Sequence, residues 1–317
     1  MKKDHAVAYL LLTVTSVIFG FSFLVTRDAL TALGVFQLLG LRFATAALVM
    51  TALAATRVVK LQLNRAKIKM ILPLAMLQPL VYFTGETLGI ELTSATESGI
   101  MIALIPIAIA LFSGAVAKER LTVRQWVSVT ISVAGVALIV AATGLTGSGS
   151  IPGYLLLLGV VTAEGLYCSL TRKVSAHCSP FEITFVMLWT GAVAFNVIGV
   201  SSAAADGTIA EYITAALQPG VLGGILYLGV LSSTVAYFGV NYALSKVKAC
   251  NTAGFANLTT VVSVLAGVFL GGESLYPLQI AGIVLILLSI WGIAGESGRC
   301  KKKLPGEAEP PGALCGE

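Results

Sequence analysis

Three charged residues lie deep inside long apolar runs of this sequence: Arg42, Glu86 and Glu164. A charged side chain at the centre of a bilayer costs about 2.5–3.5 kcal/mol on insertion scales, so it must pair with an opposite charge or face a wet cavity. The three charges sum to −1, which a proton or a cation would balance. Two interpretations stay open: a site that binds a charged small molecule, or a structural ion pair between Arg42 and Glu86.

Polar side chains recur with helical spacing beside these charges. Gln78, Tyr82 and Glu86 are each four residues apart, which places them on one face of a helix. The same pattern returns 155 residues later at Ser233, Tyr237 and Asn241. A polar stripe facing lipid would be costly, so each stripe faces a partner helix or a central cavity, and we favour the cavity.

These patterns predict one set of residues for substrate binding or coupling: Arg42, Gln78, Tyr82, Glu86, Glu164, Tyr237 and Asn241. Tyr167, Cys168 and Thr171 lie along the same helix face as the last of the three charges and extend this set. Trp189 and Asn196 are weaker candidates, because a lone Trp or Asn inside a membrane more often serves packing.

The elements that must position these residues are apolar segments of about twenty residues, the length that crosses a bilayer as a helix. We predict ten, near residues 8–26, 33–56, 70–91, 94–117, 124–142, 152–171, 181–201, 219–241, 249–270 and 277–295. Only 11% of the residues are charged, whereas soluble domains average about 25%. The sequence therefore predicts an all-α polytopic membrane protein with ten transmembrane helices. Pro79 lies within the third span, where either a kink or a tolerated proline is expected.

The basic residues between the spans are unevenly distributed. Eighteen of the 20 lysines and arginines fall in alternate gaps, and the other two are Arg27 and Arg42. The positive-inside rule then places both termini in the cytoplasm. The net charge of +5 is explained by this topology, so nucleic acid is not an expected partner. We expect the cell membrane as the location, with the bacterial inner membrane as first choice.

The chain divides near its middle. Residues 143–150 are small, polar and typical of a flexible linker. The segment Glu119–Gln125 returns 154 residues later as Glu273–Gln279. With five spans in each half, an odd number, the second half must enter the membrane from the opposite side. We predict a first five-helix repeat over 1–142, a linker over 143–151, an inverted second repeat over 152–295 and a disordered cytoplasmic tail over 296–317.

Short motifs follow one another in a familiar order: Gly20–Phe23, Leu41–Phe43, Tyr82–Phe83, Ser232–Thr234 and Asn241–Leu244. With their duplication, they resemble the drug/metabolite transporter superfamily, in its ten-span EamA-type branch, over about residues 8–295. The resemblance implies export or exchange of small metabolites with no common cofactor.

We therefore expect a secondary transporter that binds a small metabolite near the midplane, between the halves, and works by alternating access. Arg42 suits a substrate carboxylate, so an amino acid or related compound is the first expectation. Proton coupling and exchange both stay open, as do a monomer and a homodimer in the lipid bilayer. A non-transporting scaffold or regulator is the alternative, although it would not need duplicated polar stripes. A membrane-embedded enzyme is disfavoured because the spans contain no histidine and no Gly-x-Ser-x-Gly elbow.

Overall fold

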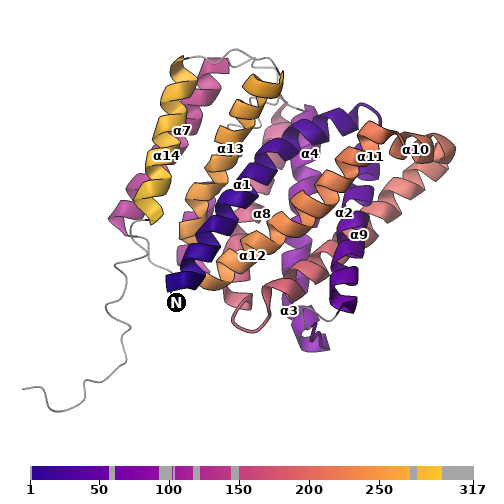
Figure 1. Ribbon diagram of the computed structural model, residues 1–317, viewed down its shortest axis with the longest axis horizontal. Coiled ribbons are helices and arrows are strands. Elements are labelled where there is room, and N and C mark those ends of the chain that lie inside the picture. The colour runs from indigo at the N-terminus through magenta and orange to yellow at the C-terminus, as the bar shows by residue number, and fades with distance from the viewer. Residues whose placement is uncertain are drawn as a thin grey trace, which may run out of the picture.

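The computed structural model describes residues 2–56, 61–92, 102, 104–116, 122–143, 150–271 and 277–294. These residues form helices joined by short connections (Figure 1), and none of them lies in a strand. Residues 144–149 of the predicted linker (143–151) and the predicted tail at 296–317 lie outside the described residues, as do Glu119 and Glu273.

Helices in the first part of the chain are α1 (Lys2–Leu30), α2 (Val35–Ala55), α3 (Arg65–Ala75), the π-helical η1 (Met76–Val81), α4 (Tyr82–Leu92), α6 (Ile105–Ala115) and α7 (Val123–Thr143). Those in the second part are α8 (Ile151–Val174), α9 (Pro180–Ala205), α10 (Ile209–Ala216), α11 (Pro219–Leu226), the π-helical η2 (Tyr227–Ala236), α12 (Tyr237–Lys246), α13 (Ala249–Gly271) and α14 (Pro277–Ala294).

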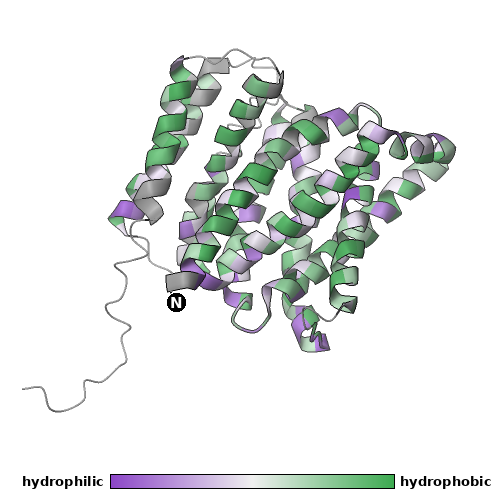
Figure 2. Cartoon of the chain, viewed as in Figure 1, coloured by the Kyte–Doolittle hydropathy of each residue, from purple (hydrophilic) through white to green (hydrophobic). Residues whose placement is uncertain are grey.

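Among the described residues, six helical runs are long and apolar enough to cross a membrane: 4–30, 35–55, 65–89, 151–174, 180–205 and 219–246. They coincide with predicted spans one, two, three, six, seven and eight. Figure 2 shows that hydrophobic residues dominate the helices along most of their length. The predicted all-α, multi-pass membrane architecture is confirmed.

Side chains set where several helices begin. The Asn64 side chain accepts a hydrogen bond from the Lys67 backbone N–H at the start of α3, and the Ser150 hydroxyl accepts one from Gly153 at the start of α8. At α9 the cap is reciprocal: Ser179 Oγ accepts from the Glu182 N–H, while Glu182 Oε2 accepts from the Ser179 N–H. These bonds satisfy backbone donors that the first turn of a helix leaves free.

Helices far apart in the sequence pack in pairs. α2 contacts α9, α7 contacts α14, α1 contacts α13 and α6 contacts α8; the α7 and α14 pair forms one edge of the bundle in Figure 1. Glycines permit the closest approaches. A Cβ atom at Gly135 would lie 2.7 Å from the carbonyl oxygen of Gly282, and one at Gly199 would lie 2.8 Å from that of Phe36.

The predicted third and eighth spans depart from regular α-helix. Each contains a π-helical stretch, η1 or η2, between two α-helical parts. Gln78 in η1 has φ −133° and ψ 111°, which are not helical values, because the residue before a proline is pushed out of the α region. The prediction that Gln78 shares one continuous helix face with Tyr82 and Glu86 is therefore wrong.

The main hydrophobic core contains residues from both parts of the chain. Phe43 of α2, Phe83 of α4, Tyr167 of α8, Met187 of α9 and Tyr237 of α12 belong to it, and none is more than 5% exposed. A polar group buried in such a core has no water to bond with and needs a partner within the protein.

Candidate functional site

Arg42 is held by hydroxyl groups from the other part of the chain. Its Nε donates to Ser233 Oγ at 2.7 Å and its Nη2 donates to Ser232 Oγ at 2.8 Å. The guanidinium also lies over the Phe83 ring, 4.6 Å from the centroid. Both serines are fully buried and Arg42 is 4% exposed. α2 thus contributes a cation whose position depends on η2 and α4.

Gln78 connects three helices. Its Nε2 donates to Glu164 Oε2 at 2.7 Å, and its Oε1 accepts a hydrogen bond from the Tyr237 hydroxyl at 3.2 Å. The break in helical geometry at Gln78 therefore coincides with a polar side chain that reaches α8 and α12. Gln78 and Tyr237 are 3% and 4% exposed, so this contact between the two parts of the chain is occluded.

The two carboxylates lie beside this bridge. The Tyr82 hydroxyl donates to Glu86 Oε1 at 3.0 Å on α4, and the Cys168 thiol lies 3.4 Å from Glu164 Oε1 on α8. Glu86 is close enough to both Arg42 and Glu164 for their charges to interact. These contacts bring six of the seven predicted residues into one cluster.

The structural ion pair between Arg42 and Glu86 is not formed. In the part of the chain that the structure describes, no Arg42 nitrogen lies within 4.0 Å of a Glu86 oxygen. The physical reason is that the serines of η2 occupy Nε and Nη2 of the arginine. The charges of the cluster are therefore solvated mainly by neutral hydrogen-bonding groups.

Asn241, the seventh predicted residue, belongs to a neighbouring network. Its Oδ1 accepts a hydrogen bond from the Tyr167 hydroxyl at 2.6 Å, and its Nδ2 donates to Thr184 Oγ1 at 2.9 Å. All three side chains are fully buried. This network ties α12 to α8 and α9 and supports the helix that carries Tyr237.

The additional candidates separate into two groups. Cys168, which lies beside Glu164, and Thr171 are both buried on α8. Trp189 is 39% exposed and donates to Thr51 Oγ1 at 3.0 Å, away from the cluster. Asn196 donates to the carbonyl oxygens of Gly40 and Ala192, which confirms a packing role between α2 and α9.

Sequence reasoning missed the groups that hold the arginine. Ser232 and Ser233 were visible as part of a motif and as the counterpart of Gln78, but neither was assigned to the site. Phe83 was also missed, although its ring contacts Arg42, Phe43 and Tyr237. Among the residues that the structure describes, no group of three His, Cys, Asp or Glu side chains could hold a metal ion.

Comparison with known proteins now decides the family. A model of the EamA-like transporter family matches the chain twice, over residues 6–141 and 151–295. The chain belongs to the EamA-like transporter family. The resemblance predicted from the motifs is confirmed, and the protein is a membrane transporter by family.

Relatives of this EamA-like chain carry transporter names. The uncharacterized transporter YcxC of Bacillus subtilis is 34% identical over 304 residues, which cover 96% of each chain. A probable terminal-alkyne amino-acid exporter of Streptantibioticus cattleyicolor is 27% identical over 63% of this chain and 62% of its own length. A probable amino-acid metabolite efflux pump of Salmonella typhimurium is 24% identical over 55% of this chain and 58% of its own.

The chain shares its fold with a solved crystal structure. It superposes with a TM-score of 0.75 over 91% of this chain and 98% of that chain, at 17% sequence identity. At this identity the likeness concerns the fold alone. The family and the relatives point to transport rather than to enzymatic activity.

Proposed function

We propose that this protein is a secondary transporter that exports small polar or amphipathic metabolites, amino acids or related compounds, by alternating access across the cell membrane. Its ten helices would form two inverted five-helix repeats with both termini in the cytoplasm. The observation that carries the proposal is a buried polar cluster, inside an apolar helical bundle, to which both parts of the chain contribute.

The pairing of helices supports two related halves. If the first five spans correspond in order to the last five, α2 on α9 and α7 on α14 are contacts between equivalent helices. Likewise, the contact between α1 and α13 corresponds to the contact between α8 and α6. The run α3–η1–α4 in the first half corresponds to the run α11–η2–α12 in the second half. Two separate matches to one family model agree with this division. Repeats of this kind place a substrate site at their interface.

The chemistry of the cluster favours a substrate with a carboxylate. Arg42 uses Nε and Nη2 to bond the serines, and among the described residues its Nη1 has no hydrogen-bond partner. A guanidinium nitrogen that is already oriented by its neighbours is suited to bind a carboxylate oxygen. The exporters named above for amino acids or amino-acid metabolites are consistent with this class.

The same cluster offers a place for a positive charge. Glu86 and Glu164 have no cationic nitrogen within 4.0 Å among the described residues, and their hydrogen-bond donors are a tyrosine hydroxyl, a thiol and an amide. A substrate ammonium group, or a proton that accompanies transport, would balance the excess negative charge. An amino acid would satisfy both the arginine and a carboxylate.

The test compares small molecules outside cells that express the wild type, Arg42→Ala, Glu86→Gln or the control Glu211→Gln on exposed α10. Any compound that accumulates with the wild type is then measured as labelled flux in proteoliposomes of purified protein. Each site variant should lower this flux about tenfold or more, the effect of losing one hydrogen bond to a charged group, while Glu211→Gln should not. Unchanged flux in both site variants would show that the site is wrong.

A further inference from the structure

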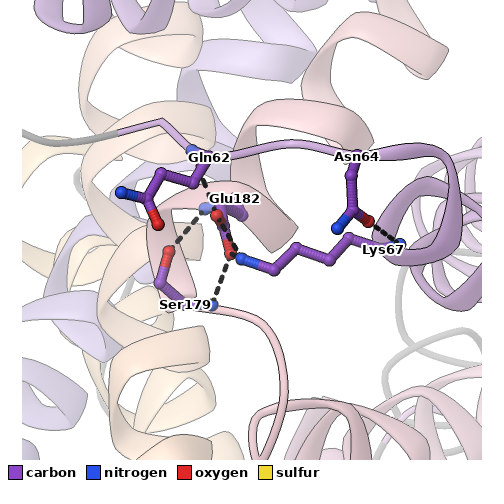
Figure 3. A network of polar contacts seen from close by, with 5 residues as sticks. All are labelled: Gln62, Asn64, Lys67, Ser179 and Glu182. Carbon is purple, nitrogen blue, oxygen red and sulfur yellow. Dashed lines mark hydrogen bonds and ion pairs between the residues drawn. The ribbon is translucent and has the colours of Figure 1, made fainter.

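An ion pair lies away from the polar cluster, where α3 and α9 begin. Lys67 Nζ donates to Glu182 Oε1 at 2.7 Å and to Oε2 at 3.0 Å. The same carboxylate accepts the backbone N–H groups of Gln62 at 3.2 Å and Ser179 at 2.9 Å (Figure 3). The Glu182 side chain is 3% exposed and that of Lys67 is 24% exposed. Glu182 thereby fixes the segment before α3 and the first turn of α3 against α9.

This contact joins the two proposed halves at one end of the molecule. α3 belongs to the first half and α9 to the second. The N-terminus and α3 lie at the same end of the bundle in Figure 1, while α10 lies at the opposite end. The distribution of lysine and arginine makes the end with the N-terminus the cytoplasmic one.

The corresponding helix positions at the opposite end carry different side chains. Lys67 and Glu182 each occupy the third position of their helix, α3 and α9. The third positions of the corresponding helices α11 and α2 are Val221 and Gln37. Val221 is 8% exposed and packs in an apolar cluster with Leu38 of α2. One end is therefore joined by opposite charges and the other by apolar packing.

We infer that Lys67 and Glu182 form a cytoplasmic latch, which keeps the transport path closed toward the cytoplasm and must open before substrate can reach the polar cluster. This inference rests on the proposed function, because it uses the inverted repeats and the orientation. Lys67 is partly exposed, so both ions regain water when they separate, and the latch is reversible. An exporter takes up its substrate from the cytoplasm, so such a latch controls how often the cytoplasmic side of the protein opens.

A native cysteine reports whether that side is open. Cys168 is 2% exposed and lies beside Glu164, one turn nearer the C-terminal end of α8. In a protein whose other four cysteines are replaced by alanine, a membrane-impermeant maleimide can reach Cys168 only when a path opens. Inverted vesicles present the cytoplasmic face to the reagent, and right-side-out vesicles present the outer face.

Glu182→Gln should raise the labelling rate of Cys168 from the cytoplasmic face about fivefold, which corresponds to about 1 kcal/mol at 25 °C. Glutamine keeps the helix cap, because Gln37 caps α2 in the same way. Lys67→Gln is the second variant and should act in the same direction. Lys67→Arg, which keeps the charge, and Lys69→Gln, an exposed lysine of the same helix, should stay within about twofold of the wild type.

Three results would overturn the latch: unchanged labelling in both Glu182→Gln and Lys67→Gln, an equal rise from both faces, or a rise from the outer face alone. Size-exclusion profiles that match the wild type establish that each variant is folded. Because labelling needs no substrate, it separates this inference from the proposed function. If the wild type moves no metabolite but the two variants raise Cys168 labelling as expected, transport alone is refuted. If transport is normal but labelling is unchanged in the variants, the latch alone is refuted.

Discussion

Ser233→Ala tests how firmly η2 holds the arginine of α2. Arg42 Nε donates to Ser233 Oγ at 2.7 Å, and neither side chain is more than 4% exposed. A hydrogen bond to a charged group contributes about 1.5–3 kcal/mol in soluble proteins, whereas interhelical bonds in membranes average about 0.6 and reach about 1.7 kcal/mol. A short bond to a guanidinium belongs at the upper end of the membrane range. We therefore expect Ser233→Ala to lower the free energy of unfolding by about 1.5 kcal/mol.

The assay is unfolding of the purified protein in mixed micelles as the fraction of denaturing detergent rises. Wild type, Ser233→Ala, Arg42→Met and the double variant form a double-mutant cycle, in which we expect a coupling free energy of about 1 kcal/mol or more. Ser289→Ala is the matched control, because Ser289 is 1% exposed but donates to a carbonyl of its own helix.

The cycle also contains the result that would refute the reasoning. A coupling free energy below about 0.3 kcal/mol, the range in which independent sites add, would show that the bond does not hold Arg42. So would a control that couples to Arg42 as strongly as Ser233 does. The cation–π contact with Phe83 at 4.6 Å would then be the main constraint on the guanidinium.

Three further perturbations address packing and recognition. Gly199→Ala should destabilise the fold by about 1–3 kcal/mol, because the added methyl would lie 2.8 Å from a backbone carbonyl oxygen of α2; Gly223→Ala, where a Cβ atom meets nothing within 4 Å, should be neutral or stabilising in the same unfolding assay. Asn241→Leu removes two fully buried hydrogen bonds and should cost about 2 kcal/mol in unfolding free energy, and an unchanged value would contradict a bracing role. Tyr237→Phe keeps the ring but loses the hydrogen bond to Gln78. We therefore expect a KM for transport about fivefold higher, while the free energy of unfolding stays within about 1 kcal/mol of the wild-type value.

The architecture was predictable because a bilayer restricts how a chain can fold. Apolar length alone located six runs that the structure shows as long helices. The short helix α10 (Ile209–Ala216) was not predicted, since eight residues between two spans are too few to give a membrane signal. Of the two expectations at Pro79, the kink is the one found, because a proline restricts the backbone of the residue before it.

Site residues were predictable where the side chain has a high free-energy cost of insertion into a membrane, and unpredictable where that cost is low. Arg42, Glu86 and Glu164 are conspicuous because a buried charge carries a large desolvation cost. Serine is inexpensive in an apolar helix, since its hydroxyl can bond its own backbone. The motif and the repeated stripe contain Ser232 and Ser233, but neither signal indicates that these serines bond Arg42 across about 190 residues of chain.

The ion pair at the start of α3 was missed for a different reason. Lys67 is one of many basic residues at the membrane surface, and Glu182 lies 115 positions away at the start of another span. Periodicity and composition carry no information about such a pairing. It becomes visible only when the folded helices bring their first turns together.

The non-helical backbone at Gln78 divides the third crossing into two rigid pieces that meet at one residue. The lower piece, α3, carries Lys67, and the upper piece, α4, carries Tyr82 and Glu86. A continuous helix would force both ends to tilt together, whereas a break lets each change direction around the shared joint. The side chain at that joint bonds Glu164 and Tyr237, so in the proposed transporter a ligand that displaces either bond would act at the joint between the two pieces. Under the proposed function and the inferred latch, ligand binding at the cluster and opening of the cytoplasmic end would be coupled through the Gln78 amide.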